Sequence, residues 1–174
     1  MERCVAVLAD THDLLRDELR AALAGADHLI HAGDLCSAAI LAEFAAMAPL
    51  TVVRGNNDRG AWADALTDTA AVELAGVHIW VCHDRADLER WPAPAGTDLV
   101  VVGHSHRPYL EDGDPRTGRP AILNPGSPGR RRFSLPVSFA RLRLGAGAWQ
   151  AEIVELEVPP ARPRRRRQQG SSNA

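Results

Sequence analysis

Two histidines follow an apolar run in the segment DLVVVGHSH, which covers residues 98–106. The apolar residues Leu99–Val102 end at Gly103, and His104 and His106 follow, one residue apart. In an extended backbone, residues i and i+2 point to the same side, so both imidazole rings can face one location. Imidazole nitrogens are common ligands of transition metals. The spacing therefore predicts a metal-binding position at the end of a strand.

Polar clusters also follow four other apolar runs in the first two thirds of the chain. The motifs are LADTH, HAGD, RGNND and VCHD, and with GHSH they supply the candidate ligands Asp10, His12, Asp34, Asn56, His83, His104 and His106. Each motif alone is typical of a turn or of a structural histidine, and only the ordered set carries weight. Because sites in open α/β sheets lie at the carboxyl ends of strands, we expect these side chains to gather there.

The types of these side chains indicate which ions they would hold. Imidazole together with carboxylate suits Mn, Fe, Zn or Ni. Seven ligands are too many for one tetrahedral ion. The set therefore predicts two divalent ions with five or six ligands each, with one carboxylate bridging them and water completing the coordination.

Hydrophobic periodicity predicts the elements that must position these residues. Short apolar runs predict strands at Cys4–Ala9, His28–His31, Leu50–Val53, Val77–Cys82 and Leu99–Val102. Two helical patterns lie between them, over residues 13–24 and 37–48, and the first places Leu14, Leu15, Leu19 and Leu23 on one face. This alternation indicates largely parallel strands covered by helices.

The pattern changes towards the end of the chain. Residues 138–158 predict an antiparallel hairpin, and residues 71–81 predict another that turns at Ala75–Gly76. Parallel strands in the first part and antiparallel strands in the second predict an α/β fold with two mixed sheets packed face to face and helices outside.

Composition limits the class of protein. The chain has 174 residues, of which 45% are hydrophobic, and we expect one domain over residues 1–158. We expect an Arg-rich, disordered tail over residues 159–174, which holds five arginines. The net charge is −2, so the rest of the chain is more acidic, which argues against a general nucleic-acid binder.

The chain carries no targeting or membrane pattern. No run approaches the roughly 18 apolar residues of a membrane span, and the first apolar run, CVAVLA, lacks the flanks of a signal peptide. The three cysteines, Cys4, Cys36 and Cys82, are too scattered for a disulfide framework. A cytoplasmic location is therefore expected, with no membrane partner.

The ordered motifs resemble those of the calcineurin-like metallophosphoesterases. The motifs that carry the resemblance are D-T-H, H-A-G-D, G-N-x-D, a strand-terminal His and G-H-S-H, and the short chain and the NPGS at residues 124–127 are similar to the small YfcE-like phosphodiesterases. The resemblance implies a four-layer α/β/β/α sandwich. It implies one ion held by Asp10, His12, Asp34 and His106, and a second held by Asp34, Asn56, His83 and His104.

The resemblance also implies the activity. Two divalent ions, with Mn as the first expectation, would bind the phosphate of a small ester and activate a bridging hydroxide that attacks phosphorus. Asp34, Asn56 and His104 would form the catalytic centre. Asp58 and His31 are expected to orient the ligands. Four arginines flank the motifs, Arg54, Arg59, Arg85 and Arg107, and each is either a rim residue or a group that grips the phosphate, with Arg85 as the first candidate for the second role.

One position departs from the family pattern in a way that bears on catalysis. Many relatives carry a histidine that helps to protonate the leaving group where this chain has Asn57, and an amide does not titrate near neutral pH. We therefore expect Asn57 to contact substrate without acting as an acid. The segment His83–Arg85 also departs from the family's H-G-H but keeps the ligand histidine.

Two other functions stay open at this point. One is a phosphomonoesterase or nucleotide phosphatase that uses the same ions. The other is a scaffold protein of the same fold, like the retromer subunit, and the completeness of the ligand set favours an enzyme over it. The sequence does not decide whether the chain forms a homo-oligomer.

Overall fold

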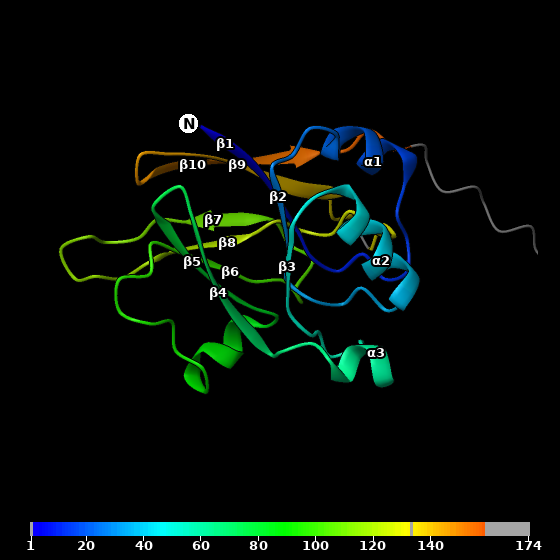
Figure 1. Cartoon of the computed structure of the whole chain (residues 1–174), viewed down its shortest axis with the longest axis horizontal. Helices are drawn as coiled ribbons and strands as arrows, with labels where there is room; N and C mark the ends of the chain where they lie inside the picture. Colours follow the sequence, from blue (N-terminus) through cyan, green and yellow to red (C-terminus); the bar gives the residue numbers. More distant parts are fainter. Residues whose placement is uncertain (1, 133, 159–174) are drawn as a thin grey trace, which may run out of the picture.

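Two five-stranded β-sheets pack face to face in the computed structural model, which describes residues 2–132 and 134–158 (Figure 1). The first sheet has the order β10-β9-β1-β2-β3, with β1 (Arg3–Leu8), β2 (His28–His31), β3 (Leu50–Val52), β9 (Ser138–Gly145) and β10 (Ala148–Glu155). The second has the order β4-β5-β6-β8-β7, with β4 (Thr69–Leu74), β5 (Val77–Cys82), β6 (Leu99–Val101), β7 (Tyr109–Glu111) and β8 (Ala121–Asn124). Both sheets are mixed, as predicted.

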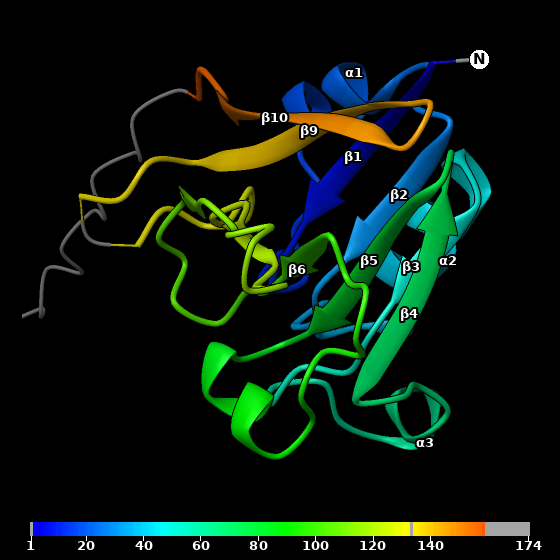
Figure 2. The ribbon, with the colours of Figure 1, turned by 90° about the vertical axis from the view of Figure 1, so that its left-hand side faces the viewer.

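Each sheet contains a parallel block that carries the motifs. β1, β2 and β3 are parallel to one another, and so are β5, β6 and β8. The arrows of β1, β2 and β5 run towards the same end of the molecule (Figure 2). The loops that follow β1, β2, β3, β5 and β6 therefore leave the sandwich at neighbouring edges, and these are the loops that hold the candidate ligands.

Strand β1 shows how the layers are built from its sequence. Val5 and Val7 face the second sheet, whereas Ala6 and Leu8 face the opposite side, because successive side chains of a strand alternate between its faces. On that opposite side, the buried Leu19 and Phe44 belong to two covering helices, α1 (Asp17–Leu23) and α2 (Ala38–Met47). The α/β sandwich predicted from the sequence is confirmed.

The outer face of the second sheet has a thinner cover. Its buried residues Cys82, Val100 and Ile122 pack with Leu88, which belongs to the short 3₁₀ helix η1 (Arg85–Glu89). The remaining helix, α3 (Ala61–Asp64), has a single turn and follows β3 (Figure 1). The elements around the carboxyl ends of the strands are thus short, which leaves room for a site.

Helix α1 is shorter than its periodicity predicts. It begins at Asp17, so Leu14 and Leu15 precede it and lie in the loop. The backbone before it has another role: the amides of His12 and Asp13 donate to the carbonyls of Asp34 and Leu35 at 3.0 and 2.8 Å. These bonds connect the loop after β1 to the loop after β2. Because they hold His12 and Asp13 against another segment, these residues do not adopt the backbone conformation of a helix.

Both predicted hairpins are present. Ala75 and Gly76 turn β4 into β5 with φ values of 53° and 81°, and Ala146 and Gly147 turn β9 into β10 in the same way. The Gly147 amide donates to the Ala75 carbonyl at 3.0 Å, so the hairpin turns join the sheets at the end away from the motif loops.

Two further expectations concern membrane-spanning helices and the tail. No helix within the described residues is long and apolar enough to cross a bilayer. The expected tail at residues 159–174 lies outside the described residues, so the domain boundary at residue 158 stays a prediction.

Candidate metal centre

The loops after β1 and β6 bring three side chains together. Nε2 of His12 and Nε2 of His106 lie 3.1 Å apart, and Oδ1 of Asp10 is 3.9 Å from the first and 3.5 Å from the second. The two rings are stacked with centroids 5.0 Å apart. Asp10 and His106 are buried, and His12 is partly exposed. One carboxylate and two imidazoles therefore face a common point, which a metal ion can occupy.

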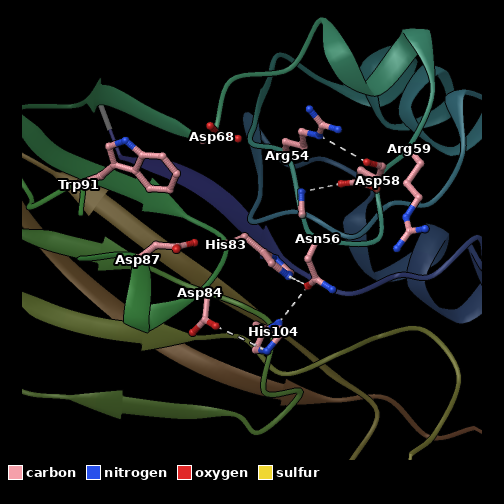
Figure 3. A pocket seen from close by; sticks show the side chains of 11 residues that line it. Arg54, Asn56, Asp58, Arg59, Asp68, His83, Asp84, Asp87, Trp91 and His104 are labelled. Atoms are coloured by element: carbon pink, nitrogen blue, oxygen red, sulfur yellow. Dashed lines mark hydrogen bonds and ion pairs between the residues drawn. The ribbon is translucent and has the colours of Figure 1, made fainter. Parts of the chain in front are cut away.

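A second group forms beside the first. Oδ1 of Asn56 lies 2.9 Å from Nε2 of His83 and 3.0 Å from Nδ1 of His104, and the two rings are perpendicular (Figure 3). His83 is buried, whereas His104 and Asn56 are exposed to the cleft. These donors come from the loops after β3, β5 and β6.

Asp34 lies between the two groups. Its Oδ2 is 3.8 Å from Nε2 of His12 and 3.6 Å from Nε2 of His83. It is 2% exposed. Asn57 donates to it twice, from the backbone amide to Oδ1 at 2.7 Å and from the side-chain amide to Oδ2 at 2.6 Å. One carboxylate thus reaches both groups. We call Asp10, His12 and His106 the first donor group, and Asn56, His83 and His104 the second donor group.

His104 and His106 face different groups, which corrects the expectation of one common location. Their φ values are 65° and 56°, so the segment is not extended and the alternation of a strand does not apply. Asp10, His12 and Asp34 also have positive φ, at 56°, 46° and 61°. Such left-handed backbone is uncommon outside glycine and clusters at functional sites.

Glycines make the close approach of these loops possible. A Cβ on Gly33 would lie 2.7 Å from Nδ1 of His83 and 2.8 Å from Cα of Gly55. A Cβ on Gly103 would lie 2.7 Å from Cβ of Ala9. Side chains at these positions would push the loops apart, so glycine is required there.

Hydrogen bonds orient the candidate ligands. Nδ1 of His83 donates to the Ala32 carbonyl at 2.7 Å, so its Nε2 keeps the lone pair that a metal needs. Oδ2 of Asp58 accepts from the amides of Asp34 and Gly55 at 2.9 and 2.8 Å, and Oδ1 accepts from the Cys36 amide at 2.7 Å. Asp58 thus joins the second and third motif loops.

The electrostatics of the site fit a cation. Burial and the nearby Asp34 raise the pKa of Asp10 to about 8. Both Asp10 carboxylate oxygens are buried without a hydrogen-bond partner among the described residues. A buried, unpaired carboxylate is costly, and a divalent ion between Asp10, His12 and His106 removes that cost.

The other ligands are suited to the same role. Burial opposes ionisation of Asp34, but the hydrogen bond from Asn57 and the charge of His83 outweigh it and hold the pKa of Asp34 below its usual value. Burial lowers the pKa of His12, and it lowers the pKa of His106 to about 4. Ionised carboxylates and neutral imidazoles are the forms that bind metals.

A cleft of about 570 Å³ opens from the second donor group. Figure 3 places Trp91, Asp68, Asp84 and Asp87 on one side of it and Arg54 and Arg59 on the other. Trp91 belongs to none of the core clusters among the described residues, whereas Trp62 packs against the core.

Two expected site residues lie elsewhere. Arg85 donates to Glu111 at 2.7 Å and its guanidinium lies 5.9 Å from the Tyr109 ring centroid, outside the cleft lining, so it does not face the ligands. His31 is fully buried, its Nε2 lies 3.1 Å from Oγ1 of Thr11, and its ring is tilted by 46° against the Phe44 ring at a centroid distance of 5.5 Å. It touches no ligand side chain and acts on the first loop through Thr11.

Three further residues lie near the candidate ligands, and of these the sequence did not single out Arg132. Nη2 of Arg132 lies 3.4 Å from Nε2 of His12, Sγ of Cys36 lies 3.4 Å from Nδ1 of His12, and Oδ2 of Asp84 lies 3.5 Å from Nε2 of His104. Cys36 follows Asp34 by two positions, and Asp84 directly follows His83 within the motif VCHD, so the motifs themselves pointed to both residues. Arg132 follows NPGS in the run RRR, and only the fold selects one arginine of the three.

The fold and the two donor groups define a two-sheet α/β sandwich protein with a candidate centre for divalent metals at its strand ends. Residues 4–147 match the calcineurin-like phosphoesterase superfamily domain, and the chain belongs to this family. It is 28% identical over 170 residues to a probable metallophosphoesterase of Methanothermobacter thermautotrophicus, covering 91% of this chain and 95% of that protein.

Solved structures share the fold. YfcE, a phosphoesterase from E. coli, has a TM-score of 0.64 at 21% identity, covering 88% of this chain and 100% of that one. Vacuolar protein sorting 29 from Cryptosporidium parvum has a TM-score of 0.70 at 18% identity, covering 90% and 99%. At these identities the likeness concerns the fold alone.

Proposed function

We propose that the protein is a phosphoesterase that depends on two divalent metal ions and hydrolyses phosphodiesters. The position of Asp34 carries the proposal, because one of its oxygens lies within 4 Å of a histidine of each donor group. In this assignment Asp10, His12, Asp34 and His106 hold one ion, and Asp34, Asn56, His83 and His104 hold the other. Mn is our first choice, with Fe, Zn and Ni as alternatives.

Divalent ions at these positions would bind phosphoryl oxygens and supply a hydroxide nucleophile near neutral pH. The chain contributes the geometry. Asn57 donates to both oxygens of Asp34, and the bond to Oδ1 comes from its backbone amide, which fixes the carboxylate between the two groups. The exposed His104 and Asn56 form the part of the centre that meets the cleft, which is where an ester would enter.

The charge of the cleft supports a small ester as the partner. Asp68, Asp84 and Asp87 line one wall, and three carboxylates repel a long polyanion such as nucleic acid. Hydrolysis of monoesters by the same centre is the second candidate, favoured by Arg54 and Arg59 on the opposite wall, which can attract an extra negative charge.

Metal-dependent turnover tests the proposal. Protein freed of metal is supplied with Mn and assayed with bis(p-nitrophenyl) phosphate and with p-nitrophenyl phosphate. We expect hydrolysis that requires Mn, with the higher kcat/KM for the diester. A higher value for the monoester would support the second candidate. No hydrolysis of either ester, with Mn bound, would favour a scaffold role, which the fold shared with vacuolar protein sorting 29 also allows.

A further inference from the structure

The segment SPGRRR, residues 127–132, runs beside the first donor group and is held there by contacts of its first residues, which we call the frame. Oγ of Ser127 donates to the Asp10 carbonyl at 2.7 Å, and Ser127 also forms a β-bridge with Val137. Nη2 of Arg16 donates to the Gly129 carbonyl at 2.8 Å. The base of the segment is therefore fixed to the loop that bears Asp10 and His12, and the arginines that follow are held near it.

Of the three arginines, Arg132 alone reaches a metal ligand. Its Nη2 donates to Nε2 of His12 at 3.4 Å. Within the described residues, no carboxylate forms an ion pair with Arg132, and Arg130 and Arg131 make no side-chain hydrogen bond or ion pair. All three are exposed. The frame is held by other residues, so the contact of Arg132 is not needed to fix the segment.

The bond from Arg132 occupies the electron pair that a metal needs. Nε2 of His12 accepts from the guanidinium in this structure, and the same nitrogen faces Asp10 and His106. Nε2 of His12 could not accept from the guanidinium and hold an ion at the same time, because one lone pair cannot serve both, so Arg132 would have to move away from His12 in the metal-bound protein. The frame keeps the displaced group beside the centre.

The displaced guanidinium needs an anion. Asp10 and Asp34 neutralise only half of the charge of two divalent ions, so the loaded centre repels Arg132 and attracts an anion. We infer that Arg132 binds a non-bridging phosphoryl oxygen of the substrate, from the side of the first donor group. The inference rests on the proposed function, and it replaces Arg85 in the role that the sequence suggested. A guanidinium suits this role because its planar fork can pair with two phosphate oxygens.

Inorganic phosphate is the probe, because its binding requires no turnover. The full chain is loaded with Mn, metal content is measured, and phosphate is titrated calorimetrically into the wild-type protein and into Arg132→Ala, Arg132→Lys and Arg131→Ala. We expect Arg132→Ala to weaken phosphate binding by about 10- to 100-fold. Arg131→Ala is the matched control and should stay within about twofold, since a charge lost at the surface matters little.

Metal affinity separates this role from a structural one. If Arg132 competes with the ion for His12, Arg132→Ala should bind Mn as tightly as the wild-type protein or more tightly. Arg132→Lys should recover part of the phosphate binding, since it restores the charge without the fork.

Equal phosphate binding by Arg132→Ala and Arg131→Ala would overturn the inference, as would loss of Mn in the first variant or a wild-type protein that binds no phosphate. The proposed function fails separately, if the wild-type protein binds phosphate through Arg132 but hydrolyses no ester.

Discussion

At the scale of single residues, Asp34 is the link between the two halves of the centre. Its position between His12 and His83 is set by two hydrogen bonds from Asn57 and by Asp58, which accepts from its amide. Of the other candidate ligands, Asp10 also has a carboxylate oxygen within 4.8 Å of a ring nitrogen of His83, and the remaining ones each belong to one group. Substitutions should therefore differ in how many ions they affect.

We expect Asp34→Ala to weaken both ions and to reduce kcat for a diester by more than about 10²-fold, because its carboxylate is shared. His12→Ala should weaken one ion and Asn56→Ala the other. Calorimetric titration with Mn checks the number of sites and their affinities. Asp112→Ala, at an exposed position outside the cleft, is the control. Near-normal turnover of Asp34→Ala with both ions bound would contradict the bridging role.

Asn57 should make turnover sensitive to the leaving group. Its side-chain amide is bound to Asp34, and an amide cannot supply a proton near neutral pH. Esters of nitrophenols should therefore be cleaved much faster than alkyl esters, with a gap of about 10²–10⁴-fold beyond that of an enzyme with a general acid. A series of diesters that differ in leaving-group pKa measures this through kcat/KM. A flat dependence would mean that another group already protonates the leaving oxygen.

At the scale of elements, the site depends on loops that pack backbone against backbone. Gly55 is an example, since a Cβ there would collide with the backbone nitrogen and Oδ1 of Asp34. Gly145, at the end of β9, has only Cα of Glu2 near its virtual Cβ, at 3.8 Å. Neither glycine has a positive φ. The two positions therefore differ in the room available for an added Cβ and not in backbone strain.

Gly55→Ala should therefore lower stability by about 1–3 kcal/mol and reduce Mn content, because the added methyl displaces Asp34. Gly145→Ala should change neither quantity measurably. Thermal unfolding without metal and elemental analysis with metal check the two effects. Equal unfolding temperatures for the two variants would show that the loop can move aside at no cost.

At the scale of the whole molecule, the buried His31 couples stability to pH. It is fully buried between the first sheet and α2, and burial lowers its pKa to about 3. In the unfolded chain the His31 imidazole takes up a proton near pH 6.5, whereas in the folded chain it stays neutral down to a pH of about 3. The folded state therefore has its full stability with respect to His31 above pH 6.5, and it loses stability as the pH falls from 6.5 towards 3.

His31→Gln should remove this dependence. Below pH 6.5 the free energy of unfolding of the wild-type protein should fall by up to about 1.4 kcal/mol per pH unit because of His31. The free energy of unfolding of the variant should lack this decrease. Urea unfolding at pH 7 and pH 4.5 in the presence of a chelator measures the difference, and the chelator excludes effects of metal release. Equal losses in the two proteins would mean that His31 is protonated in the folded state.

The sequence alone determined which residues come together and at which ends of which strands. Apolar runs of strand length, each followed by a polar motif, predicted the positions of β1, β2, β3, β5 and β6, and glycine-containing turns predicted the two hairpins. These features are local, because the alternation of side chains and the conformational needs of turns act over a few residues. The family motifs singled out seven side chains that the structure places in two neighbouring groups, and their role as metal ligands stays a prediction.

Only the tertiary structure decided how those residues face one another. His104 and His106 diverge to separate groups because the loop leaves the extended conformation, and its positive φ values are held by contacts with distant segments. Asn57 contacts Asp34, and Arg132, far along the chain, meets His12, whereas Arg85 turns to Glu111. Such contacts join residues 23 to 120 positions apart, and no local pattern encodes them.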